Sequence, residues 1–209
     1  VIGAGGLGSP AAFYLAAAGV GRIGLADGDK VDLSNLQRQI LHSTSRVGEA
    51  KTASAATVLC DLNPNVELVT VNRFVTDDNI GGLISDYDFV IDATDSMSGK
   101  RLINDTCVRV GKPLSHGAIW RYFGQTITVL PGTPCYSCLF ETDPEESQAR
   151  GPLGVTAGII GTIQAAEAIK YLAGVGELLT STLLRLDTLT MDFTKVKVAL
   201  NPECKAHQN

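Results

Sequence analysis

The chain begins with Val-Ile-Gly-Ala-Gly-Gly-Leu-Gly, in which two apolar residues lead directly into a glycine-rich turn. An apolar segment of helical character follows at residues 11–18. A strand, a glycine turn and a helix in this order form the unit whose backbone N–H groups and helix N-terminus receive phosphate. Glycine lets the backbone approach a phosphate and lets the helix pack close to the strand. We therefore expect the phosphates of a nucleotide to lie against Gly3, Gly5, Gly6 and Gly8.

An aspartate, Asp27, ends the next apolar segment, residues 23–26. A carboxylate at this position of such a fold accepts hydrogen bonds from ribose hydroxyls. The alternative is that Asp27 only caps a turn at the end of a strand. Because the glycine turn precedes Asp27 at the spacing that nucleotide sites use, we predict the ribose contact.

Two cations further along the chain, Arg38 and Lys51, indicate a triphosphate rather than a nicotinamide dinucleotide. A guanidinium can hold phosphate oxygens in a bidentate manner, and an ammonium acts as a point charge. Each cation alone is compatible with a solvated surface position, but the pair beyond the ends of parallel strands favours ATP. Asn35 and Gln39 can add neutral hydrogen bonds to the same ligand.

Asp95 follows the apolar segment 89–92 and is our candidate for binding Mg²⁺. Mg²⁺ prefers one or two carboxylates together with phosphate oxygens and water. The alternative is that Asp95 caps the following helix, a position that also suits aspartate. We interpret Asp92 as buried structure. His42 and His116 have no visible partner, and His116 is a minor candidate for lining the site.

Two cysteines, Cys135 and Cys138, have the spacing of a zinc knuckle. A structural Zn²⁺ needs four ligands, and Cys204 and His207 offer the third and fourth. The alternative is that the first two cysteines are free thiols or a redox pair. The remaining cysteines, at positions 60 and 107, lie in apolar helical patterns and are interpreted as buried core thiols.

Strands and helices alternate in the first half of the chain, and the pattern changes after about residue 114. The pattern predicts strands at residues 1–2, 23–26, 66–71, 89–92 and 124–130 and helices at 11–18, 51–62, 77–85, 100–110 and 154–172. A mobile loop is expected at 135–150 and a closing hairpin at 183–187 and 192–199. The predicted fold is an α/β, Rossmann-like doubly wound sheet, largely parallel, with antiparallel C-terminal strands and a zinc knuckle. The helix at 154–172 carries small residues that permit close packing, which a dimer interface could use.

The composition excludes several classes of protein. The 209 residues suit one domain, and the net charge of -5 argues against general nucleic-acid binding. No apolar run is long enough to suggest a membrane span, and no signal peptide is visible. Five cysteines, an odd number, favour a reducing compartment, and we expect a cytoplasmic protein. Because residue 1 already lies in a strand, we expect residues to be missing upstream.

Taken together, these motifs resemble the MoeB/ThiF/HesA group of ubiquitin-activating-enzyme-like adenylyltransferases. The resemblance extends over nearly all of the chain. It rests on the glycine turn at 3–8, Asp27-x-Asp29, the segment Ser34-Asn35-Leu36-Gln37-Arg38-Gln39, Lys51, Thr94-Asp95, Cys135-x-x-Cys138, the segment 161–170 and Asn201-Pro202-Glu203-Cys204.

The resemblance implies an activity and a partner. Such enzymes bind MgATP and the Gly-Gly tail of a small ubiquitin-like sulfur carrier, and they act as homodimers. The carboxylate of the tail attacks the α-phosphate and gives an acyl-adenylate and pyrophosphate, ahead of thiocarboxylate formation in molybdopterin or thiamine type biosynthesis. The implied organisation is one domain, 1–209, with a nucleotide-binding half at 1–113 and a carrier-binding, zinc and dimer half at 114–209.

The chain departs from the family pattern at three places. Ser147 stands where family members often carry a loop cysteine, so we expect adenylation without a thioester there. The second Cys-x-x-Cys pair is Cys204-x-x-His207. The family's N-terminal helices, which commonly supply an arginine to the partner subunit's triphosphate, do not precede Val1. The region around Gly117 and Gly124 is expected to form a glycine-only channel for the carrier tail.

Three other functions compete with this one. An NAD-dependent oxidoreductase would need the glycine turn and Asp27 but leaves Arg38, Lys51 and the cysteines unexplained. An inactive scaffold of the same fold could bind a ubiquitin-like partner without turnover. A third possibility is an enzyme that adenylates a peptide or tRNA, of which the acidic balance disfavours tRNA.

Overall fold

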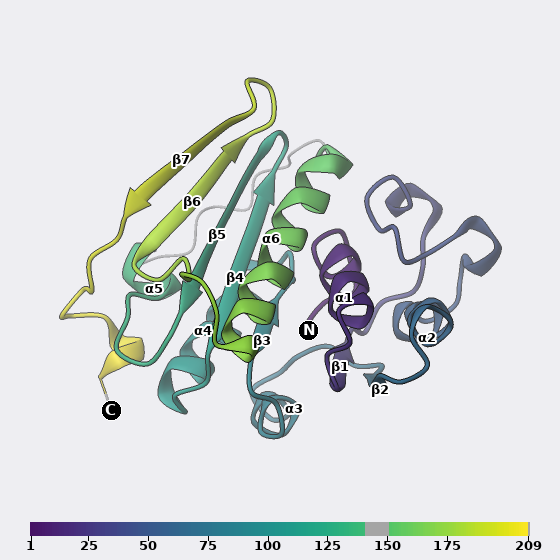
Figure 1. Cartoon of the computed structure of the whole chain (residues 1–209), viewed down its shortest axis with the longest axis horizontal. Helices are drawn as coiled ribbons and strands as arrows, with labels where there is room; N and C mark the ends of the chain where they lie inside the picture. Colours follow the sequence, from purple (N-terminus) through teal and green to yellow (C-terminus); the bar gives the residue numbers. More distant parts are fainter. Residues whose placement is uncertain (141–150, 209) are drawn as a thin grey trace.

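The computed structural model describes residues 1–140 and 151–208. Its sheet has a parallel part and an antiparallel part (Figure 1). The strands are β1 (Arg22–Ala26), β2 (Glu67–Val71), β3 (Val90–Asp92), β4 (Leu114–Trp120), β5 (Phe123–Val129), β6 (Thr182–Asp187) and β7 (Asp192–Lys197). The pairs β1–β2 and β3–β4 are parallel, and β4 to β7 continue as antiparallel neighbours. Ile2 bridges Ala26 and Asp92, so the segment at residues 1–3 joins the pair β1–β2 to the five strands β3 to β7.

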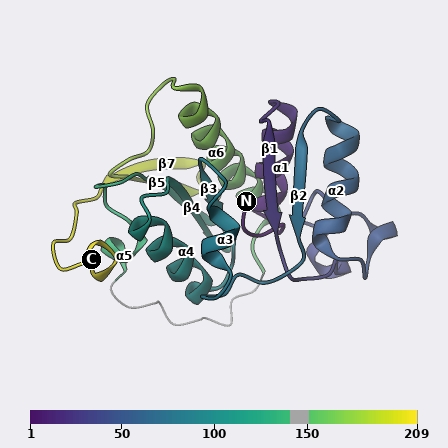
Figure 2. The ribbon, with the colours of Figure 1, turned by 90° about the horizontal axis from the view of Figure 1, so that it is seen from below.

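Helices cover both faces of this sheet. Figure 2 shows α6 on one side of β3, β4 and β5, with α3 and α4 on the other side. The helices are α1 (Gly8–Ala17), α2 (Lys51–Leu62), α3 (Ile80–Ile84), α4 (Met97–Arg109), α5 (Tyr136–Leu139) and α6 (Gly154–Ala173). Short 3-10 turns span Leu33–Asn35, Thr44–Arg46 and Lys205–His207. The predicted doubly wound architecture with antiparallel C-terminal strands is confirmed.

The strand that the sequence analysis missed is β4. Its residues Ser115, His116 and Gly117 interrupt the apolar pattern, yet all three are buried because helices pack on both faces of the strand. The helix expected at 100–110 begins earlier, since Ser96 caps it by accepting a hydrogen bond from the Gly99 N–H. Part of the expected loop forms α5, and Ser147 lies outside the described residues.

The small residues of α6 have a role inside the chain. A Cβ at Gly161 would collide with the Leu7 carbonyl, and Ala165 and Ala168 are buried in the same core. Gly161, Ala165 and Ala168 therefore allow α6 to pack against α1, and the expectation that they serve a dimer interface is wrong. Gly158 has no neighbouring atom within 4 Å of such a Cβ.

Two glycines on the sheet are also explained by α6. A Cβ at Gly117 would lie 2.5 Å from Oε1 of Gln164, and a Cβ at Gly124 would collide with Ile160. Both glycines thus permit the helix to approach the strands, which is a different role from lining a channel for a peptide tail. No helix within the described residues is both long enough and apolar enough to cross a lipid bilayer.

Candidate functional site

A cleft of about 760 Å³ lies where β1, β2 and β3 end. Its walls are the glycine turn, the loop after β1, the loop after β2 and the segment from Ala93 to Lys100. Ligands bind at this edge of parallel sheets because the loops that follow the strands are brought together there. Seven of the predicted nucleotide-site residues line it: Gly3, Gly5, Gly6, Asp27, Arg38, Gln39 and Lys51, and so does Asp95.

The glycine turn is shaped by contacts that exclude side chains. Gly3 has φ +101°, and a Cβ there would lie 2.6 Å from the Ala93 carbonyl oxygen. A Cβ at Gly8 would collide with the Gly3 carbonyl, so Gly8 shapes the turn while Gly3, Gly5 and Gly6 line the cleft. At Gly5 the nearest atom to a Cβ is Gln39 Nε2, at 3.5 Å, which leaves the backbone accessible to a ligand.

Asp27 is held by the backbone around it. Its Oδ2 accepts from the Ala4 N–H at 2.7 Å, and its Oδ1 accepts from the Asp29 N–H at 2.8 Å. The Asp27 carboxylate therefore links the glycine turn to the loop after β1, so Asp27 does cap a turn at the end of a strand. Each oxygen keeps a second lone pair, and Asp27 lines the cleft, so it can also accept hydrogen bonds from a ligand hydroxyl.

The two cations reach the cleft in different ways. Lys51 is buried, and its Nζ lies 2.9 Å from Oδ2 of Asp29, whose side chain is half exposed. Arg38 Nη2 donates to Asn35 Oδ1 at 2.6 Å, so Asn35 orients the guanidinium and is not itself among the lining residues. Gln39 is buried, and its Oε1 has no hydrogen-bond partner in the described part of the chain. The Lys51 ammonium and the Arg38 guanidinium can neutralise phosphate oxygens in the cleft.

Directly before the cleft residues Ala93 and Thr94, Asp92 is the centre of a buried network. Its Oδ1 accepts from Thr94 N at 3.0 Å and Thr94 Oγ1 at 2.7 Å. Its Oδ2 accepts from Lys100 Nζ at 3.2 Å and His116 Nδ1 at 2.8 Å. Burial alone would raise the pKa of Asp92, but the Lys100 ammonium and the hydrogen bonds from His116 and Thr94 hold it below its ordinary value. The interpretation of Asp92 as buried structure agrees with this geometry.

His116 does not line the cleft. Its ring is fully buried, 4.8 Å from the ring of Tyr136, and burial lowers the pKa of His116. Asp95, in contrast, is exposed and follows Thr94 into the cleft. Asp92 is therefore buried and ionised, whereas Asp95 is accessible to a ligand. Both aspartates lie at or just after the end of the same strand, so the sequence alone does not distinguish their environments.

His42, which has no visible partner in the sequence, bridges two elements. Its Nε2 lies 2.9 Å from the Ala4 carbonyl oxygen, and its Nδ1 lies 2.9 Å from Ser54 Oγ. Because a carbonyl only accepts, the proton is assigned to Nε2, and Nδ1 accepts from the Ser54 hydroxyl. Burial lowers the pKa of His42, although its contact with the Ala4 carbonyl opposes the shift.

This shift predicts a pH dependence of stability. A lowered folded-state pKa means that neutral His42 contributes stability above the unfolded pKa of about 6.5, and that this contribution is lost as the pH falls below it. We expect the free energy of unfolding, measured by urea titration, to decrease between about pH 7.5 and pH 5.5. The decrease should be smaller in His42→Gln, and an equal decrease in both proteins would contradict the assignment.

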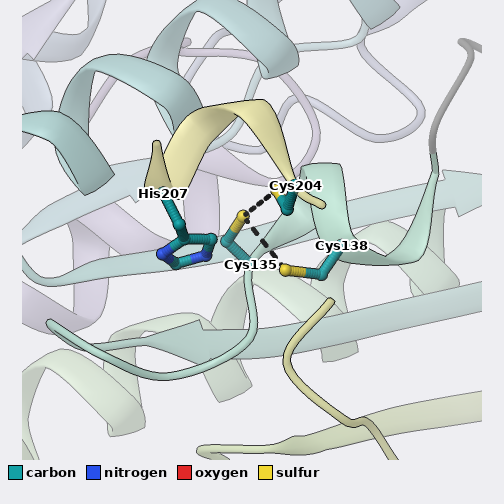
Figure 3. A group of neighbouring side chains, drawn as sticks. All are labelled: Cys135, Cys138, Cys204 and His207. Atoms are coloured by element: carbon teal, nitrogen blue, oxygen red, sulfur yellow. Dashed lines mark hydrogen bonds between the residues drawn. The ribbon is translucent and has the colours of Figure 1, made fainter. Parts of the chain in front are cut away.

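The four predicted zinc ligands lie together (Figure 3). The Sγ atom of Cys135 is 3.8 Å from that of Cys138 and 3.9 Å from that of Cys204. All four donor atoms, including the His207 nitrogen, lie within 4.8 Å of one another. Zn–S bonds of about 2.3 Å in a tetrahedron separate two sulfurs by about 3.8 Å, so the arrangement suits one metal ion. His207 Nε2 is buried without a partner among the described residues, as a metal-facing nitrogen would be.

The other two cysteines differ from each other. Cys107 is buried, as predicted, and burial raises the pKa of its thiol to about 12. Cys60 is exposed on α2, so its interpretation as a core thiol is wrong. The apolar pattern of α2 does not distinguish the face that packs on the sheet from the face that meets solvent.

Several cleft residues were not anticipated from the sequence. Arg73 and Phe74 line the cleft from the loop after β2, and Asp29, quoted above only as part of the Asp27-x-Asp29 motif, pairs with Lys51. Lys100 lies in α4 and connects Asp92 to the Gly117 carbonyl. Arg73 and Phe74 could have been predicted as cleft residues, because they directly follow a parallel strand. Lys100 gave no such signal, because its partners are set by tertiary packing.

Comparison with known proteins identifies the family. The model of the ThiF family matches residues 1–206. A SAMP-activating enzyme E1 of Haloferax volcanii is 44% identical over 209 residues, covering 98% of this chain and 77% of that protein. A sulfur carrier protein adenylyltransferase of Thermus thermophilus is 41% identical over 215 residues, covering 98% and 79%. A molybdopterin-synthase adenylyltransferase of Escherichia coli is 40% identical over 210 residues, covering 98% and 84%.

The fold has counterparts among solved structures. A crystal structure of E. coli MccB with MccA-N7isoASN matches with a TM-score of 0.88 and covers 100% of this chain and 66% of that chain. The two sequences are 21% identical, so this likeness concerns the fold alone. The extent of the family match and the identity to the curated relatives show that the chain belongs to the ThiF family, as the sequence motifs predicted.

Proposed function

We propose that this chain adenylates the C-terminal Gly-Gly carboxylate of a small ubiquitin-like sulfur carrier. The observation that carries the proposal is the convergence of Asp27, Arg38, Lys51 and Asp95 on one cleft in a member of the ThiF family. Relatives named as a sulfur carrier protein adenylyltransferase and a molybdopterin-synthase adenylyltransferase support the same activity and its use in molybdopterin-type biosynthesis. None of the described residues that line the cleft favours peptide adenylation, an inactive scaffold or a nicotinamide enzyme.

The chemistry follows from charge. A carboxylate is already ionised at neutral pH, so no general base is required, but it is repelled by the anionic triphosphate. The Lys51 ammonium and the Arg38 guanidinium offset this repulsion and stabilise the pyrophosphate that leaves. A carboxylate oxygen forms the new bond to the α-phosphorus as the bond from that phosphorus to the bridging oxygen of pyrophosphate breaks.

Each site residue has a proposed role. Asp27 accepts from the ribose hydroxyls, Gly3, Gly5 and Gly6 face the phosphates, and Asp95 holds Mg²⁺, which supplies charge neutralisation when bound. Gln39 adds a neutral hydrogen bond, and Asn35 acts through Arg38. The cluster of Cys135, Cys138, Cys204 and His207 would hold a structural Zn²⁺.

We further propose that the domain acts as a homodimer in a reducing compartment such as the cytoplasm. The β4–β5 turn, the β6–β7 hairpin and the start of α6 lie at one end of the molecule (Figure 1), and these segments carry exposed apolar side chains. They include Trp120, Phe123, Val155, Met191 and Phe193. A second copy that covers this end would bury them. Light scattering that returns the mass of one chain only would contradict the dimer.

Exchange of labelled pyrophosphate into ATP tests the adenylation. We expect exchange that requires both the protein and a carrier ending in Gly-Gly, and that falls at least about 100-fold in Asp95→Ala because a charge-stabilising group is lost. Asp88→Ala is the matched control, since Asp88 is an exposed aspartate outside the cleft. Exchange that persists in Asp95→Ala would contradict the role of Asp95.

A further inference from the structure

The Asp92 carboxylate is held by four donors and has no free oxygen. Oδ1 receives the backbone and hydroxyl protons of Thr94, and Oδ2 receives those of Lys100 and His116. The side chains of Asp92, Lys100 and His116 are at most 3% exposed. A buried carboxylate with this set of partners is ionised and cannot rotate without losing charge-assisted hydrogen bonds.

The network is anchored in three neighbouring elements. Lys100 comes from α4 and also donates to the Gly117 carbonyl of β4 at 2.5 Å. Gln164 comes from α6, and its Nε2 donates to the Asp92 carbonyl at 2.8 Å and to the Ser115 carbonyl at 3.0 Å. The end of β3 is therefore fixed from both faces of the sheet.

Thr94 connects this rigid network to the cleft. It is half-buried, it lines the cleft, and it directly precedes the exposed Asp95. An N–H and a hydroxyl of one residue on the same carboxylate oxygen form a closed local turn, which fixes the direction in which the chain leaves the strand. The position of Asp95 thus depends on the two hydrogen bonds that Thr94 makes.

We propose that Thr94 is a positioning residue that presents Asp95 to the divalent cation of the nucleotide. This inference rests on the proposed function, because it takes Asp95 as the carboxylate that holds the cation. Residues that orient a metal ligand commonly change metal affinity by about 10- to 100-fold when they are replaced. Thr94→Val keeps the shape and the backbone N–H but removes the hydroxyl donor.

Calorimetric titration of the whole chain with ATP, with and without Mn²⁺ as the probe cation, tests the inference. We expect the wild-type chain to bind Mn²⁺–ATP more tightly than metal-free ATP. In Thr94→Val the ratio of these two affinities should be about tenfold smaller than in the wild-type chain. Its affinity for metal-free ATP should stay unchanged, since the phosphate-binding cations are untouched. Thr94→Ser should restore the enhancement, because serine keeps the hydroxyl.

Thr162→Val is the matched control. The Thr162 hydroxyl bonds to the Gly158 carbonyl within α6, and Thr162 does not line the cleft. The inference is overturned if Thr94→Val keeps the wild-type enhancement, or if it weakens ATP binding equally with and without Mn²⁺. A wild-type chain that binds no ATP in either condition would instead overturn the proposed function, and the inference with it.

Discussion

Lys51→Met is expected to lower carrier-dependent pyrophosphate exchange by about 100- to 1,000-fold. The Lys51 ammonium is buried at the cleft wall, where water screens charge poorly and one cation has a large effect on a developing pyrophosphate. The partner of Lys51, Asp29, has a side chain that is 54% exposed, so the carboxylate left behind remains solvated. The fold should therefore survive the substitution, and the loss should appear in the rate.

Lys30→Met separates this effect from a change of overall charge. Lys30 is exposed, and its backbone bridges Ala50, the residue before Lys51, but Lys30 is not among the residues that line the cleft. Exchange should remain within about threefold of the wild-type rate in this control, as is usual for surface charges. Exchange in Lys51→Met that stays as high as in Lys30→Met would contradict the role of Lys51.

Cys135→Ser is expected to lose one bound zinc per chain and to lower the free energy of unfolding by more than about 3 kcal/mol. Cys135 is fully buried, and Asn104 Nδ2 donates to its sulfur at 3.4 Å. It also belongs to the apolar cluster between α4 and the sheet, so removal of the metal would leave protonated thiols inside that core. Metal content by mass spectrometry and urea titration would measure the two effects.

The exposed Cys60 provides the control for this substitution. Cys60→Ser changes the same atom on the solvent side of α2, so metal content and stability should be unchanged. A chelator should destabilise the wild-type chain and leave Cys135→Ser unaffected. Equal stability of the wild-type chain before and after chelation would argue against a structural metal.

The sequence was most informative where one local feature determines the structure. The glycine turn predicted the strand, turn and helix at the start of the chain, because the backbone leaves no room for a Cβ at Gly3 or Gly8. The cysteine spacing predicted the cluster in Figure 3, since two ligands three residues apart can meet one ion. In both cases the spacing of a few neighbouring residues in the sequence carries the signal.

Prediction failed where the environment comes from distant segments. The close approach of α6 to Gly117 and Gly124 was not predicted, because Gln164 and Ile160 are more than 30 residues away from these glycines in the chain. The strand β4 was missed because it carries buried polar residues such as His116, whose Nδ1 donates to the distant Asp92 carboxylate. Such partners are fixed by tertiary packing, which local periodicity does not describe.

The most direct test of the account is the intact mass of a carrier protein after incubation with this chain, MgATP and pyrophosphatase. We expect a carrier with one adenylyl group on its terminal glycine, and no such product when the tail ends in an amide. Hydrolysis of ATP to ADP with an unchanged carrier would contradict it, because cleavage would then occur at the γ-phosphate and not at the α-phosphate.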